Sequence, residues 1–242
     1  MKKLTLTLAA LALSATGAAA QDVVRMGTEG AYPPFNFIND ANELEGFEID
    51  LGNEMCQRAE LTCEWVVNDW DTIIPNLVAG NYDTIIAGMS ITDARREVIA
   101  FTQEYKMPDP SLYAALSGTD SSVIEGGVIA AQSNTIQAGH VAETGADLLE
   151  FPTPDETISA VRSGEADAVL ADGDFLRTIV SEAADLEFIG DPVFVGGGVG
   201  MGLRQSDTEL RETFDAVIAE MKEDGSLNEL LIKWFGEDTP VF

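Results

Sequence analysis

Short apolar runs alternate with amphipathic segments along most of this chain, and this alternation most constrains its fold. The first strands are expected at residues 23–27, 64–67 and 82–87, with helices at 50–59 and 72–79. The same alternation returns between residues 128 and 183, and two more helices are expected at 207–224 and 227–234. Strands joined through helices predict an α/β fold with a mainly parallel sheet and helices on both of its faces.

Two breaks interrupt this pattern. Residues 106–110 contain two prolines, which lack a backbone N–H, so a crossing segment is expected there instead of a central strand. Residues 196–202 contain five glycines. A dinucleotide-binding loop would need a helix directly after them, whereas residues 203–204 have the character of a strand. A hinge with freedom in φ is therefore the preferred interpretation of the second break.

The segment 87–101, Ala-Gly-Met-Ser-Ile-Thr-Asp-Ala-Arg-Arg-Glu-Val-Ile-Ala-Phe, carries the first candidate site. Gly88 and Ser90 follow an expected strand, Thr92 or Asp93 can cap the next helix, and Arg95 falls in its first turn. Free backbone N–H groups, a hydroxyl and a guanidinium fork at a strand end can bind a carboxylate. The alternative is that Ser90 and Thr92 only cap the helix and Arg95 is a solvated surface charge.

Three blocks in this order resemble the periplasmic amino-acid-binding proteins of bacterial ABC importers, the histidine and lysine/arginine/ornithine-binding group. They are Gly-Thr-Glu-Gly-Ala-Tyr-Pro-Pro-Phe-Asn-Phe at 27–37, Gly-Phe-Glu-Ile-Asp-Leu-Gly-Asn-Glu-Met-Cys at 46–56, and the segment 87–101. The resemblance implies a two-lobed periplasmic binding protein fold with two hinge crossings (type II). Lobe 1 would comprise residues 21–108 and 203–242, and lobe 2 residues 109–202 with hinge segments at both ends. The ligand would bind in the cleft as the lobes close.

The same resemblance implies a role for each site residue. Arg95 would bind the α-carboxylate of the ligand, with Ser90 adding a hydroxyl and Gly88 permitting close approach of the backbone. Asp172, at the end of the strand expected at 168–170, would bind the α-ammonium group. Thr135 would donate to the carboxylate from a helix N-terminus in lobe 2, although Ile136 departs from the polar residue that often follows.

Three further residues would form the side-chain part of the pocket. By the same resemblance, Tyr32 and Trp70 would enclose the ligand side chain, and ordinary core packing is the alternative for both. Glu29 lies where an acid meets the distal cation of a basic ligand, in a motif variant that resembles basic-amino-acid and opine binders. A solvated loop acid is the alternative for Glu29.

The N-terminus and the cysteines point to export. Lys2 and Lys3, an apolar run over 4–13 and the alanines before residue 21 predict a signal peptide over residues 1–20, and hence a periplasmic protein. In an oxidising compartment the only two cysteines, Cys56 and Cys63, are expected to form a disulfide. A metal pair is the alternative, but a single histidine and the absence of C-x-x-C spacing give it little support, so no metal or cofactor is expected.

Charge limits the partners. The formal net charge is −29, and removing Lys2 and Lys3 with the signal peptide makes it −31 (−29 − 2), which argues against nucleic acids and anionic membranes.

The leading interpretation is a monomeric, non-enzymatic receptor that captures an amino acid and delivers it to an inner-membrane ABC permease. The rival is an enzyme on the same scaffold, similar to cyclohexadienyl dehydratases. It would need a positioned acid or base, and Glu29 is a better placed candidate than His140.

Overall fold

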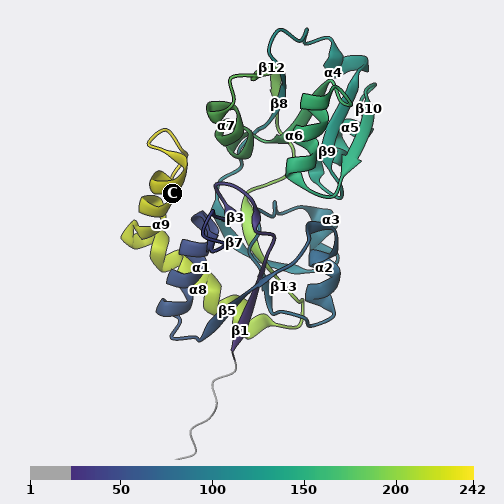
Figure 1. Ribbon diagram of the computed structural model, residues 1–242. Helices are drawn as coiled ribbons and strands as arrows, with labels where there is room; N and C mark the ends of the chain where they lie inside the picture. The colour runs from purple at the N-terminus through teal and green to yellow at the C-terminus, as the bar shows by residue number, and fades with distance from the viewer. Residues whose placement is uncertain (1–22) are drawn as a thin grey trace, which may run out of the picture.

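Two five-stranded sheets, each in its own lobe, form the framework of the protein (Figure 1). The computed structural model describes residues 23–242, and the signal peptide predicted for residues 1–20 lies outside the described residues. The lobe 1 sheet has the order β5 (Cys63–Val67), β1 (Val24–Thr28), β6 (Thr84–Ile85), β13 (Val199–Leu203) and β7 (Ala100–Lys106). The lobe 2 sheet has the order β10 (Asp147–Phe151), β9 (Val128–Gln132), β11 (Ala168–Asp172), β8 (Ser111–Leu116) and β12 (Leu186–Val193).

Helices cover both faces of the lobe 1 sheet. One side carries α1 (Phe47–Arg58), α8 (Thr208–Asp224) and α9 (Ser226–Phe235), and the other carries α2 (Trp70–Val78) and α3 (Asp93–Arg96) (Figure 1). Helix α8 turns Phe214, Ile218 and Met221 toward the core, at the spacing that places side chains on one helical face. Lobe 2 contains α4 (Val123–Gly126), α5 (Ile136–Ala142), α6 (Pro154–Ser163) and α7 (Gly173–Glu182).

The expectation of mainly parallel sheets is wrong. Strand β1 runs parallel to β5 and β6, but β13 runs antiparallel to β6 and β7. Lobe 2 repeats this arrangement, because β11 is parallel to β9 and antiparallel to β8, which is also antiparallel to β12. The antiparallel pairs arise because β7 and β8 lead the chain out of lobe 1 and β12 and β13 bring it back in the opposite direction.

The glycine-rich second break is divided between the crossing segment and a strand: Gly196, Gly197 and Gly198 precede β13, and Gly200 and Gly202 lie within it. Of the five glycines, only Gly196 has a left-handed φ, 76°. A Cβ at Gly200 would lie 2.8 Å from the Ile91 side chain, so a larger residue would push β13 off its neighbours. Because β13 already belongs to the lobe 1 sheet, the second crossing precedes Val199, earlier than the return expected at residue 203.

Several short strands escaped prediction because they carry little periodic signal. Strands β2 (Ala31–Tyr32), β3 (Asn36–Ile38) and β4 (Leu44–Glu45) form a small antiparallel sheet within a segment expected to be loop and turn. This sheet holds Tyr32 between β1 and α1, where it can reach the other lobe.

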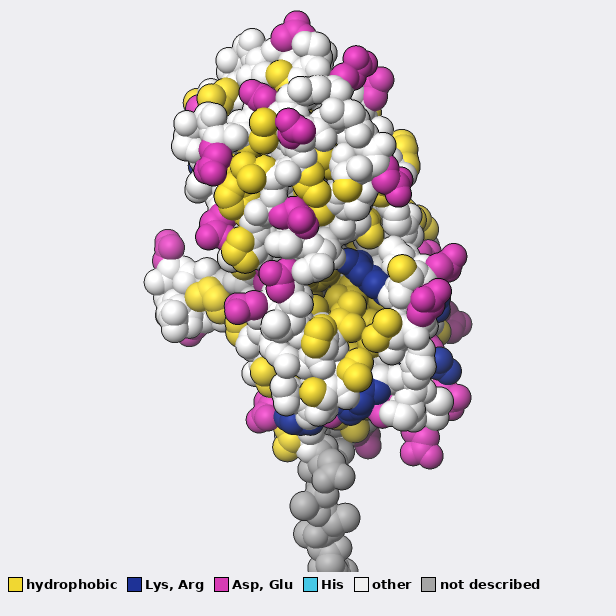
Figure 2. All heavy atoms as spheres, turned by 90° about the vertical axis from the view of Figure 1, so that its right-hand side faces the viewer, with side chains coloured by type: hydrophobic (Ala, Val, Ile, Leu, Met, Phe, Trp, Pro, Cys, Tyr) yellow, Lys and Arg dark blue, Asp and Glu magenta, His cyan; other side chains and the backbone are white. Residues whose placement is uncertain are grey.

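Acidic side chains are scattered over both lobes on the face shown in Figure 2, while hydrophobic side chains and a basic group lie at the waist between the lobes. This distribution fits a strongly acidic chain whose carboxylates are mostly solvated. None of the helices within residues 23–242 combines the length and the hydrophobicity that crossing a membrane requires.

The predicted disulfide is present. Cys56, in the last turn of α1, is bonded to Cys63, the first residue of β5, and their Cα atoms are 6.2 Å apart. The bond therefore fastens the end of a core helix to the start of an edge strand.

Removing this disulfide is expected to lower the free energy of unfolding by about 2 kcal/mol, because the closed loop is short and the entropy it removes from the unfolded chain is modest. The measurement is urea unfolding of the oxidised protein, the reduced protein and the Cys56→Ala/Cys63→Ala variant. Equal stability of the oxidised and reduced forms would contradict the expectation.

Candidate ligand-binding site

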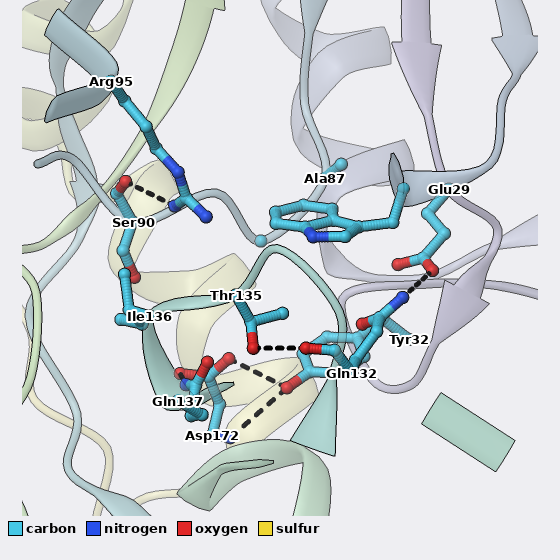
Figure 3. Close-up of a pocket in the computed structure, with 12 residues that line it drawn as sticks. Glu29, Tyr32, Ala87, Ser90, Arg95, Gln132, Thr135, Ile136, Gln137 and Asp172 are labelled. Atoms are coloured by element: carbon cyan, nitrogen blue, oxygen red, sulfur yellow. Dashed lines mark hydrogen bonds between the residues drawn. The ribbon is translucent and has the colours of Figure 1, made fainter. Parts of the chain in front are cut away.

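A pocket lies between the lobes, and about 320 Å³ in it and at its mouth is free of protein atoms, part of it open to solvent. All eight residues singled out in the sequence line it: Glu29, Tyr32, Trp70, Gly88, Ser90, Arg95, Thr135 and Asp172. The structure adds four residues that the sequence did not assign to the site: Ala87, Gln132, Ile136 and Gln137. Figure 3 shows these side chains converging on one space from both lobes.

Arg95 enters the pocket from the first turn of α3. Thr92 caps this helix, as expected, and its hydroxyl accepts a hydrogen bond from the Arg95 backbone N–H at 3.2 Å. The guanidinium donates from Nη1 to the Ser90 carbonyl at 2.8 Å and lies 5.2 Å from the centre of the Trp70 ring. Burial lowers the pKa of Arg95 to about 10, so the side chain is still charged at neutral pH. No carboxylate among the described residues forms an ion pair with it.

Asp172 faces the pocket from lobe 2, at the end of β11 and just before α7. Its Oδ2 accepts a hydrogen bond from the Tyr32 hydroxyl at 2.8 Å, and its Oδ1 accepts one from Gln137 Nε2 at 3.0 Å. Burial raises the pKa of Asp172 to about 6, against the opposing effect of the Tyr32 hydrogen bond. Since Tyr32 belongs to lobe 1, this contact joins the two lobes across the pocket. The Tyr32 ring also stacks on Phe175 of lobe 2, with ring centres 4.5 Å apart.

Glu29 lies directly after β1 and is only 8% exposed, so it is not the solvated loop acid of the alternative reading. Gln132 of lobe 2 donates from Nε2 to Glu29 Oε1 at 2.6 Å. Burial raises the pKa of Glu29 to about 7, and the nearby carboxylates of Asp69 and Asp71 act in the same direction. Within residues 23–242 no lysine or arginine forms an ion pair with Glu29.

Trp70 and Thr135 have structural tasks as well as a place in the pocket. Trp70 begins α2 and belongs to a buried cluster of lobe 1, so it is a core residue that also faces the pocket. The Thr135 hydroxyl caps α5 by accepting from the Ala138 N–H at 3.1 Å, and it donates to the Gln132 carbonyl at 2.6 Å. Its role as a carboxylate donor therefore stays a prediction.

Gln132 and Gln137 were missed because their partners are distant in sequence. Gln132 ends β9, a strand whose preceding residues are small and buried, and Gln137 is the second residue of α5. A polar residue at the carboxyl end of a buried strand is a signal for a ligand site, and Gln132 fits it.

The two residues considered for enzyme chemistry lie in different places, since Glu29 lines the pocket and His140 does not. His140 lies in a groove of lobe 2 with Tyr113 and Asp191, away from the pocket. No group of three or more His, Cys, Asp or Glu in the described part of the chain is placed to hold a metal ion.

The fold and pocket define a class: two-lobed α/β receptors that enclose a small solute carrying charges of both signs. Residues 24–237 match the family described as bacterial extracellular solute-binding proteins, family 3, and the chain belongs to this family. It is 33% identical to the lysine/arginine/ornithine-binding periplasmic protein of Escherichia coli K12, over 97% of both chains. It is 35% identical to the histidine-binding periplasmic protein of the same strain, over 98% of both chains.

A solved structure is more similar still. The chain is 66% identical, with a TM-score of 0.87, to a periplasmic His/Glu/Gln/Arg/opine family-binding protein from Silicibacter pomeroyi in complex with lysine. The alignment covers 90% of this chain and 100% of that one. The predicted family and two-lobed fold are thus confirmed, and these relatives are named as binding proteins, in agreement with a receptor and not an enzyme.

Proposed function

We propose that this protein is a periplasmic receptor for an amino acid with a cationic side chain, which it delivers to an ABC permease. The observation that carries the choice of ligand is Glu29, a buried carboxylate that shares a pocket with Arg95 and Asp172 and has no cationic partner among the described residues.

The zwitterionic part of the ligand would be held from both lobes. Arg95 offers N–H groups to the α-carboxylate from lobe 1, and Asp172 accepts from the α-ammonium group from lobe 2. We propose that residues 23–106 and 199–242 move as lobe 1 and residues 111–193 as lobe 2. The monomeric receptor would close when a ligand satisfies both groups.

The distal cation would then meet Glu29. A ligand with a neutral side chain gives the buried Glu29 no counter-charge, so Glu29 has to remain ionised without one or take up a proton, and such a ligand is expected to bind less tightly than a cationic one. Tyr32 and Trp70 line the path to Glu29 with aromatic rings suited to an aliphatic chain that ends in a cation. The proposal agrees with relatives named for lysine, arginine, ornithine or histidine, and with the lysine complex of the S. pomeroyi protein.

Isothermal titration calorimetry of the ligand-free mature protein with lysine, arginine, histidine, glutamine, glutamate and alanine tests the proposal. A cationic amino acid is expected to bind most tightly. Preference for glutamate or alanine would contradict the role of Glu29, and binding of none of them would contradict the amino-acid class.

Binding of a cationic amino acid is expected to strengthen as the pH rises. Burial raises the pKa of Glu29 to about 7 and that of Asp172 to about 6, whereas both must be ionised to pair with the ligand. Below these values binding has to displace protons, so affinity should fall roughly tenfold per pH unit for each proton displaced. The check is calorimetry between pH 5.5 and 8.5 in buffers of different ionisation enthalpy, which counts the protons released.

The raised pKa of Glu29 also affects the free energy of unfolding, which should fall as the pH rises, whereas the affinity for the ligand should rise. Because the pKa of Glu29 is raised by burial, the folded state holds this proton more tightly than the unfolded chain. Its stabilising contribution is therefore complete at low pH and is lost as the pH rises through about 7. Glu29→Gln should remove the decline in unfolding free energy that Glu29 causes between its ordinary pKa of 4.5 and about 7, and keep the decline due to Asp172, which ends near pH 6. An affinity independent of pH in the wild type would refute the assignment.

A further inference from the structure

We infer that Gln132 determines which cation the pocket prefers: its amide donates to one oxygen of Glu29, so a guanidinium fork would have to share that oxygen with Gln132, whereas an ammonium group can bind the other oxygen alone. The inference rests on the proposed function and makes it more specific, because it predicts that lysine is preferred to arginine.

The first step is that Gln132 is held in one orientation. It ends β9 in lobe 2 and is buried, at 7% exposure. Its Nε2 donates to Glu29 Oε1 at 2.6 Å and to the Pro152 carbonyl at 3.0 Å. Both N–H groups of the amide are therefore in use, and the amide cannot turn away from Glu29 without losing a bond to its own lobe.

The second step is that the other oxygen of Glu29 is available to a ligand. Figure 3 shows one oxygen joined to the Gln132 amide and the second turned toward the middle of the pocket. Among the described residues, Oε2 receives no hydrogen bond, and it is absent from the side-chain atoms that are both fully buried and unpartnered. Oε2 therefore retains access to the pocket space.

The third step is the difference between the two cations. A guanidinium binds a carboxylate best through two parallel N–H···O bonds, one to each oxygen, so at Glu29 it would share Oε1 with the Gln132 amide. An ammonium group is a compact charge that Oε2 alone can satisfy. Asp69 and Asp71 add negative charge near Glu29 but favour both cations alike. Only the hydrogen bond from Gln132 distinguishes them.

The fourth step links this choice to closure. Gln132 belongs to lobe 2 and Glu29 to lobe 1, so their hydrogen bond forms only when the lobes are together. A lysine-like ligand that binds Oε2 leaves this bond in place, whereas a guanidinium fork competes with Gln132 for Oε1 and so opposes closure.

The test compares dissociation constants for lysine and arginine in the wild type and in Gln132→Met, a variant of similar volume without the donor. Calorimetry at pH 8.5 keeps Glu29 ionised, so the comparison does not depend on its protonation. The wild type is expected to bind lysine more tightly than arginine. In Gln132→Met the ratio of the two constants should fall about tenfold, the effect of one charge-assisted hydrogen bond.

Gln137→Met is the matched control. Gln137 also donates a buried amide hydrogen, but to Asp172, the acceptor proposed for the α-ammonium group that every amino acid carries. The Gln137→Met variant should bind lysine and arginine less tightly by the same factor, so that the ratio of their dissociation constants is unchanged. Thermal melting of each variant separates loss of binding from loss of fold. If Gln132→Met does not fold, Gln132→Asn replaces it, because its shorter side chain moves the amide away from Glu29.

Each outcome decides the inference. A ratio that changes less than twofold in the Gln132 variant, or a wild type that binds arginine as tightly as lysine, overturns it while leaving the receptor for basic amino acids intact. A wild type that binds neither ligand overturns the proposed function as well.

Discussion

Arg95→Ala is expected to weaken amino-acid binding by about 2–5 kcal/mol, roughly thirtyfold to several thousandfold, because the ligand carboxylate is left without its charged partner in a closed pocket. The unfolding free energy should change far less. The Arg95 side chain forms no ion pair with the described residues, and it donates one hydrogen bond, to the Ser90 carbonyl. Calorimetry and thermal melting measure the two effects separately.

Arg96→Ala is the control for this prediction. Arg96 is the next residue of the same short helix, and its guanidinium is exposed and lies over Phe101, 5.8 Å from the ring centre, outside the pocket. The Arg96→Ala variant should bind the amino acid about as tightly as the wild type. Wild-type affinity in Arg95→Ala, or equal losses in both variants, would show that α3 does not present the carboxylate site.

Asp172→Asn is expected to cost a similar amount, about 2–5 kcal/mol of binding free energy, because the α-ammonium group loses its charged acceptor while still being taken out of water. The substitution keeps one oxygen that can accept from the Tyr32 hydroxyl, so the contact between the lobes is preserved in part. Titrations at pH 8 are appropriate, since the pKa of Asp172 is about 6 and the wild-type side chain is then ionised.

Asp191→Asn removes the same charge from an exposed position of lobe 2 outside the pocket and is the matched control. It should bind like the wild type. If Asp172→Asn also does so, the ammonium group lies elsewhere and the pairing of charges from opposite lobes has to be abandoned.

The sequence predicted those parts of the site that depend on local structure. A strand, a capping residue and a helix follow one another within a few positions, which placed Arg95 in a first helical turn, and the structure has Thr92 in the capping role. The family resemblance was needed to prefer a ligand site over a solvated surface charge for Arg95. The disulfide was identifiable from the number of cysteines and the predicted signal peptide. Resemblance to a family supplied Glu29 and Asp172, which local pattern alone would have left as solvated acids.

What could not be predicted depends on how distant segments meet. Gln132 matters because it contacts Glu29, 103 positions earlier in the chain, once the lobes close. The antiparallel strands were missed because strand direction follows from the path between the lobes and not from hydrophobic pattern. The glycines of residues 196–202 predicted a hinge, and three of them precede β13 in the crossing segment, while packing against Ile91 accounts for the small residue at Gly200.

The paired crossings have a mechanical consequence. Strands β7 and β13 are neighbours in one sheet and β8 and β12 are neighbours in the other, so the outgoing and returning segments run side by side between the lobes. Two tethers anchored in this way resist shear and twist but permit bending about one axis. Arg95 and Asp172 should therefore approach each other along nearly the same arc at every closure. Much of the orientational entropy that two independent bodies would lose on meeting has already been lost when the chain folds.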